Sequence, residues 1–200
     1  SYSKGKPKGP VKEVGKSDKR GTLVTFTPDK EIFTEVTEFD YEILSNRMRE
    51  LSFLNKGLTI SIKDNRKKDK DGNAISETFL SKEGLSEFIK YLDESREPII
   101  NNIIKMEGEK NGIPVEVAMV YNSSFSENLH SYVNNINTHE GGTHLSGFRR
   151  GLTNTLKKYA DSSGLTDKLK FDISGDDFRE GLTAVIPQKV GSPHFDGHTT

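Results

Sequence analysis

The sequence predicts an α+β protein, because segments with strand patterning lie toward both ends of the chain and segments with helical patterning lie between them. Two observations support this class. Residues 58–62 alternate between apolar and polar side chains, as in a half-buried strand. Residues 43–51 and 145–159 instead place their apolar side chains three or four positions apart, which is typical of a helix with one buried face.

The N-terminal stretch combines a basic segment with one predicted strand. Residues 1–20 hold seven Lys or Arg against two acidic residues, so we expect a solvated loop or hairpin there. Residues 21–29 contain β-branched and aromatic side chains, which predict a strand of about five residues. Pro28 is expected to end this strand, because proline cannot donate a backbone hydrogen bond.

A helix is predicted after this strand. Asp40 is expected to cap it, because a short acidic side chain can accept hydrogen bonds from the first amides of a helix. The apolar residues on its predicted face are Ile43, Leu44, Met48 and Leu51. Gly57 is expected to end the helix in the left-handed conformation and is also the best candidate for a domain boundary.

The middle of the chain predicts mainly strands. We expect, in order, a strand from residue 58, a polar turn at 64–74, a strand at 75–80, a helix at 84–92, and strands at 99–107 and 113–121. Asp71-Gly72 and Asn111-Gly112 are typical of tight turns, so each is expected to join two antiparallel strands.

The C-terminal part predicts one long helix and one strand. Thr143 is expected to cap the helix, and Gly164 to end it. Its expected core-facing residues are Leu145, Phe148, Leu152, Leu156 and Tyr159. The last strand is expected at 182–190, after an acidic turn at 175–177 that we interpret as a turn rather than a cation site.

The composition excludes several classes of protein. The 200 residues include no cysteine, which excludes disulfide scaffolds, Cys-zinc modules, iron–sulfur clusters and thiol catalysis, and which is compatible with a reducing cytoplasm. No apolar run approaches the ~18 residues that a membrane span needs. Lys and Arg total 29 against 30 Asp and Glu, so the net charge of −1 does not indicate a class of partner.

Two motifs superficially similar to ligand sites do not fit them. His139 and His144 are five residues apart instead of four, and the glycines between them would break the helix that a zinc motif requires. Residues 5–10 contain glycine and lysine, but they lack the spacing of a phosphate loop, and their prolines lack the amides that bind phosphate. We therefore predict neither a metal site nor a phosphate loop here.

Basic residues gather on the predicted helix 145–160, and these are Arg149, Arg150, Lys157 and Lys158. Arg150 and Lys157 are seven positions apart, so they lie on nearly the same face. Such a face either is only solvated or contacts the phosphates of a nucleic acid. The residue pattern alone favours the solvated interpretation.

Several longer strings resemble the B subunit of bacterial DNA gyrase. They occupy residues 20–29, 39–44, 49–57, 132–144, 147–149 and 177–185. The string from Asn134 to His144, Asn-Asn-Ile-Asn-Thr-His-Glu-Gly-Gly-Thr-His, is the most specific of them. The resemblance runs from about residue 5 to residue 197, and the topoisomerase IV B subunit shares most of it.

The resemblance implies a domain organisation and a function. Residues 1–55 would be the C-terminal part of a GHKL ATPase domain, and residues 56–200 a transducer domain similar to domain 2 of ribosomal protein S5. The full-length protein would couple ATP binding and hydrolysis, with Mg²⁺, to DNA strand passage and negative supercoiling. Its implied partners are DNA, the gyrase A subunit and a second B subunit, in the cytoplasm and away from membranes. The alternatives are a decatenating topoisomerase IV B subunit, or a non-catalytic DNA-binding module with the transducer fold.

The resemblance also implies roles for individual residues. Thr22 matches a threonine that helps to bind adenine, and Arg149 matches a basic residue that faces the cavity through which DNA passes. Arg150, Lys157 and Lys158 join Arg149 as DNA-facing residues because they share its helix. The residues that do most of the nucleotide chemistry in this family lie upstream, so we expect this stretch to bind no cofactor alone and not to hydrolyse ATP.

The end of the chain departs from the family pattern. His198 stands where the family has glutamine, and Thr200 stands where it has a lysine that reaches the γ-phosphate. Threonine carries no positive charge that could stabilise a transferring phosphoryl group. No catalytic residue is therefore assigned within this chain.

Overall fold

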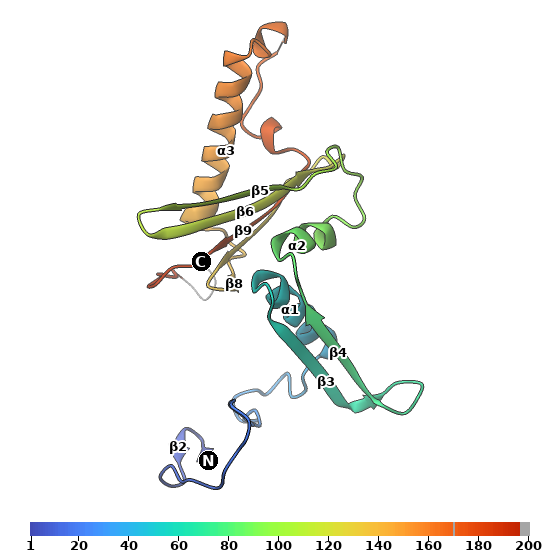
Figure 1. Cartoon of the computed structure of the whole chain (residues 1–200), viewed down its shortest axis with the longest axis vertical. Coiled ribbons are helices and arrows are strands. Elements are labelled where there is room, and N and C mark those ends of the chain that lie inside the picture. Colours follow the sequence, from blue (N-terminus) through green and yellow to red (C-terminus); the bar gives the residue numbers. More distant parts are fainter. Residues whose placement is uncertain (170, 197–200) are drawn as a thin grey trace. The chain divides into compact units, whose positions relative to one another are not determined.

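The structure is a computed structural model that describes residues 1–169 and 171–196. It divides into two compact units, Ser1–Leu44 and Ser45–Thr200. Figure 1 shows the helices and strands in chain order. The positions 198 and 200, at which the sequence departs from the family pattern, lie outside the described residues.

The first unit is mostly exposed coil. Its short strands β1 (Tyr2–Ser3) and β2 (Lys6–Pro7) form a small antiparallel hairpin. The strand predicted within residues 21–29 is wrong, since these residues form no strand and Leu23 is 92% exposed. A strand needs a neighbour whose amides and carbonyls pair with its own, and no described residue supplies that neighbour here.

Helix α1 (Tyr41–Leu54) confirms the predicted cap, because Asp40 Oδ1 accepts a hydrogen bond from the Ile43 amide at 2.9 Å. The predicted end is also confirmed, since Gly57 follows the helix with a φ of 83°. The buried face differs from the prediction, because Ile43 is 69% exposed whereas Leu54 is buried. Ile43 belongs to the first unit, in which no described residue is buried.

Strands β3 (Thr59–Lys68) and β4 (Ala74–Leu80) form a two-stranded antiparallel sheet of their own, as the predicted hairpin requires. β3 continues into the segment that was predicted to be a turn. Asp64 stabilises this continuation by accepting hydrogen bonds from the amide and the guanidinium of Arg66, at 2.8 and 2.9 Å. These hydrogen bonds lower the pKa of Asp64 to about 2.

The main sheet has five strands in the order β5-β6-β9-β7-β8. They are β5 (Ile104–Lys110), β6 (Ile113–Tyr121), β7 (Asn128–Val133), β8 (Ile136–Asn137) and β9 (Leu182–Gln188). β7 and β9 are parallel and the other neighbours antiparallel. Two short 3₁₀ helices, η1 (Thr166–Lys168) and η2 (Asp177–Arg179), precede β9.

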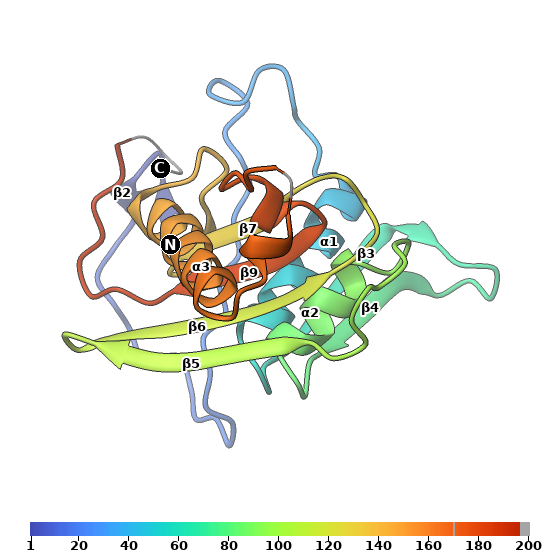
Figure 2. The same cartoon turned by 90° about the horizontal axis from the view of Figure 1, so that it is seen from above.

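Helices cover both faces of this sheet. α2 (Leu85–Leu92) packs on one face and α3 (Thr143–Ser162) on the other (Figures 1 and 2). In β6, Ala118 shares a core cluster with Phe88 of α2, whereas Met119 shares the second cluster with Leu145 of α3. Successive side chains of β6 therefore point into two different cores, one on each face of the sheet, instead of pointing alternately into a core and into solvent.

Strand β5 begins later than the predicted 99–107. The Asn111-Gly112 turn places Lys110 opposite Ile113, and the continuous pairing runs from there to Ile104 opposite Met119. Residues 100–103 leave the sheet, and Ile100 and Ile103 pack against the core that contains α2. The pairing resumes before them, where the Ile99 amide donates to the Tyr121 carbonyl at 2.9 Å and Pro98 bridges to Asn122.

The start of α3 differs from the prediction. Gly142 occupies the cap position with a φ of 143°, and Thr143 is the first helical residue, without a capping hydrogen bond from its side chain. A φ of 143° is readily accessible only to glycine, so the cap position follows from the glycine pair.

The far end of α3 is confirmed at Gly164 and corrected at Tyr159. Gly164 has a φ of 65° and donates to the Asp161 carbonyl, while the Leu165 amide donates to the Ala160 carbonyl. Tyr159 is 62% exposed, and Ala160 is the buried residue of this turn. The apolar stripe therefore turns away from the core before the helix ends.

Candidate nucleic-acid interface

The structure brings the four predicted DNA-facing residues together on α3. Arg150, Lys157 and Lys158 are exposed, whereas Arg149 is half-buried. Thr22, the residue that the resemblance links to adenine, belongs to the first unit and lies in exposed coil.

Arg149 is held by Glu127. Its Nε and Nη2 donate to the two carboxylate oxygens of Glu127 at 3.1 and 2.8 Å. Arg179 Nε donates to the same carboxylate at 2.8 Å, and Arg179 Nη1 donates to Thr153 Oγ1 at 2.6 Å. Glu127 thus joins α3 to η2, and its charge partly compensates that of Arg149.

The described residues supply no such partner for the other three cations of α3. Within the described part of the chain, Arg150, Lys157 and Lys158 form no ion pair. An open groove follows the last turns of the helix, and its lining includes Lys157, Lys158 and Asp161. Exposed cations without a protein partner are available to phosphate groups, so this face is the part of α3 best suited to contact a nucleic-acid backbone.

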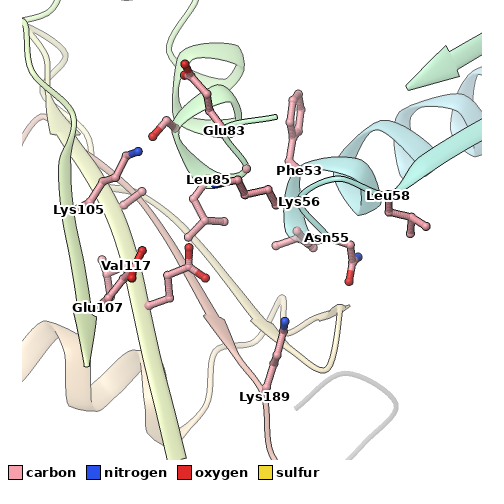
Figure 3. Close-up of a pocket in the computed structure, with 15 residues that line it drawn as sticks. Phe53, Asn55, Lys56, Leu58, Glu83, Leu85, Lys105, Glu107, Val117 and Lys189 are labelled. Carbon is pink, nitrogen blue, oxygen red and sulfur yellow. The ribbon is translucent and has the colours of Figure 1, made fainter. Parts of the chain in front are cut away.

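A second concave region lies between α1, α2 and the strands β5 and β6 (Figure 3). This pocket has a volume of about 530 Å³. Its charged lining residues are Lys56, Lys105, Lys189, Glu83, Glu107 and Glu116. Because three cations face three carboxylates, the lining has no net preference for an anionic ligand.

His144 of the histidine motif lies beside Thr138. His144 Nε2 lies 3.4 Å from Thr138 Oγ1, and burial lowers the pKa of His144. No group of three or more His, Asp or Glu among residues 1–169 and 171–196 could hold a metal ion.

None of the helices in these same residues is long and apolar enough to cross a membrane.

The acidic turn before β9 is stabilised locally. Asp177 Oδ2 accepts a hydrogen bond from the Ser174 amide at 2.7 Å, which lowers the pKa of Asp177. Asp176 pairs with Arg179. Both carboxylates therefore have a structural use in this turn.

Sequence reasoning missed Glu127, which holds Arg149, and Arg179, which binds the same carboxylate. They are 52 positions apart, and neither is related to Arg149 by a helical or strand spacing. The one signal was that Arg179 lies within a string that resembles the gyrase B family.

The fold is that of the ATPase regions of type II topoisomerases. The 43K ATPase domain of Thermus thermophilus gyrase B matches with a TM-score of 0.69 at 31% identity, over 84% of this chain and 44% of that chain. The topoisomerase IV ATP binding domain of Francisella tularensis matches with a TM-score of 0.64 at 26% identity, over 86% of this chain and 44% of that chain. The predicted α+β class is confirmed.

The chain belongs to the DNA gyrase B family, which matches residues 84–200, more than half of the sequence. The DNA gyrase B protein of Cytophaga aurantiaca is 58% identical over 198 residues, which are 99% of this chain and 41% of the relative. The chain thus spans about two fifths of the length of this relative. The resemblance seen in the sequence is confirmed.

Proposed function

We propose that this chain is part of a gyrase-type B subunit that couples ATP binding and hydrolysis to DNA strand passage and negative supercoiling. The 58% identity to a DNA gyrase B protein carries this proposal, because it extends over 99% of the chain and therefore over both units. The gyrase A subunit and a second B subunit are the proposed protein partners, and the cytoplasm is the proposed location.

We propose a separate role for each of the two domains that the resemblance implies. Residues 1–55 are proposed as the C-terminal part of a GHKL ATPase domain, and residues 56–200 as the transducer. A sheet that is packed on both faces supports the second assignment, since a rigid body can transmit a displacement from one edge to another.

The exposed face of α3 is proposed to contact the DNA backbone. Arg150, Lys157 and Lys158 would bind phosphates without reading the base sequence. Arg149 joins them in this proposal, but Glu127 already accepts two hydrogen bonds from its guanidinium. We therefore expect Arg149 to contribute less than Arg150, Lys157 and Lys158, for which the described residues offer no ion pair.

ATP and Mg²⁺ are proposed cofactors of the full-length protein. Thr22 is the residue of this chain that would adjoin adenine, but its exposed coil forms no cradle with the other described residues. The described residues alone do not fit a nucleotide, so no step of ATP chemistry is assigned to them.

A chimera tests the proposed function. Residues 1–196 would replace the aligned segment of the Cytophaga aurantiaca gyrase B protein, and the product would be assayed on relaxed plasmid with the gyrase A protein of that organism. We expect ATP-dependent negative supercoiling within about tenfold of the unmodified protein, because 58% identity preserves most buried contacts.

The unmodified Cytophaga aurantiaca protein and a reaction without ATP are the controls. A chimera that is folded, binds DNA and does not supercoil it would contradict the proposal and favour the non-catalytic DNA-binding module. Far-ultraviolet circular dichroism and a cooperative thermal transition establish that the chimera is folded.

A further inference from the structure

The turn between β7 and β8 holds the chain that leaves β9. Asn134 has a φ of 48°, and its amide donates to the Gln188 carbonyl at 2.8 Å. Its side chain pairs with the backbone of Val190 in both directions, since Oδ1 accepts from the Val190 amide at 3.0 Å and Nδ2 donates to the Val190 carbonyl at 2.8 Å. One carboxamide thus extends the pairing two residues beyond the end of β9.

The next residue in the same turn is held by α1 and by the residue that follows this helix. The carbonyl of Asn135 accepts a short hydrogen bond from Arg47 Nη2, and Asn135 Nδ2 donates to Asn55 Oδ1 at 3.3 Å. The side chains of Arg47, in α1, and of Asn55, the residue after α1, are themselves fixed. Arg47 pairs with Glu50 at 2.8 Å, and Asn55 Nδ2 donates to the Leu51 carbonyl at 2.8 Å.

These contacts belong to adjacent residues of a stiff turn. Asn135 has a φ of 68°, so both central residues are left-handed, as in the tight hairpin turns that asparagine tolerates. A displacement of one residue in such a turn moves the other, because few backbone angles can absorb it.

We propose that the Asn134–Asn135 turn is a positioning element that sets the path of the chain after β9 and ties this path to helix α1. Asn134 fixes Val190, and Arg47 fixes the turn from the other side. α1 and residues 188–190 are far apart in the sequence, and the turn bonds to both. A shift of α1 is therefore transmitted to the segment that follows β9.

Amide hydrogen exchange of the 200-residue chain, resolved by NMR, tests the proposal. Asn134→Gly keeps the left-handed turn but removes the side chain that bonds to the backbone of Val190. The Val190 amide should therefore exchange at least about fivefold faster. Asn134→Asp retains an acceptor for the Val190 amide and should keep most of its protection. If the Val190 amide exchanges equally fast in both variants, the Asn134 side chain does not hold Val190 and the proposal is refuted.

The connection to α1 is tested by Arg47→Met, which keeps an aliphatic side chain but removes the hydrogen bond to Asn135. We expect the Val190 amide to exchange about twofold faster or more, as is usual for coupled contacts. Arg49→Met is the matched control, because Arg49 lies on the same helix and pairs with Glu77 instead of the turn. Equal Val190 rates in the two variants would overturn the proposal.

A consequence for the enzyme rests on the proposed function. In the chimera, Arg47→Met and Asn134→Gly should raise the number of ATP molecules hydrolysed per supercoil about twofold or more. The reason is that each variant weakens the transmission of a shift of α1 to the segment after β9. Arg49→Met should leave this ratio unchanged, and a ratio that is the same in all three variants would refute the consequence. If the unmodified chimera fails to supercoil, the proposed function fails, while the exchange rates still decide the role of the turn.

Discussion

At Gly181, two segments of backbone lie too close together to admit a side chain. A Cβ at this position would lie 2.3 Å from the carbonyl oxygen of Asn122 and 3.0 Å from that of Ser124. The φ of Gly181 is 73°, and its own carbonyl accepts a hydrogen bond from the Asn122 amide at 2.8 Å. The segment that enters β9 is therefore fixed by a close approach as well as by backbone conformation.

Gly181→Ala should consequently lower the free energy of unfolding by about 3 kcal/mol or more, because the collision with the Asn122 carbonyl adds to the cost of the left-handed conformation. Urea denaturation measures this change. Gly147→Ala is the control, since Gly147 lies in α3 with open space around it and should gain about 0.5–1 kcal/mol. A loss below about 1 kcal/mol in Gly181→Ala would contradict the geometric argument.

Among the elements, α3 performs two tasks on different sides. Leu145, Phe148 and Leu152 pack against the core that contains β9. Arg150 and Lys157 lie on an exposed side, so they can be changed without disturbing that core. This separation allows the DNA-contact proposal to be tested without loss of the fold.

Replacing Arg150, Lys157 and Lys158 together by alanine should weaken DNA binding and reduce the slope of log K against log salt by about 2.7, which corresponds to three lost phosphate contacts. Fluorescence anisotropy with duplex DNA at several salt concentrations measures this slope. The matched control replaces Lys67, Lys68 and Lys70, which are three exposed cations around the β3–β4 turn. An equal change in both triple variants would show that only total charge matters.

For the whole molecule, two partly buried histidines connect stability to pH. Burial lowers the pKa of His130 and of His144 below the ordinary value of 6.5. Below pH 6.5 the unfolded chain therefore binds protons that the folded chain does not yet bind, so the free energy of unfolding falls as the pH drops. Asp64 adds a separate loss as the pH falls from 3.8 to about 2.

The urea midpoint should accordingly be lower at about pH 5.5 than at about pH 7.5. His130→Gln with His144→Gln should reduce this difference, because the two histidines with a lowered pKa are removed. His194→Gln should not, since the side chain of His194 is 91% exposed. A midpoint that is the same at both pH values would contradict the assignment of lowered pKa values.

Local chemistry determined the parts of the fold that depend on neighbouring residues. Asp40 and Gly57 delimit α1 because a cap and a left-handed glycine act within a few positions. Asn111-Gly112 set the β5–β6 turn for the same reason. The gyrase B resemblance was also legible in the sequence, since it depends on the order of residues alone.

Only the tertiary structure decided which patterned segments find a partner. Residues 21–29 have strand composition but no described neighbour with which to pair. Tyr159 continues the helical stripe, yet its side chain is exposed, and Leu152 is the last residue of α3 that packs against the core of β9. Glu127 meets Arg149 and Arg179, and Asn134 meets Val190, across separations for which no local spacing exists. Such contacts depend on how the sheet brings distant segments together, and the periodicity of the sequence does not predict that arrangement.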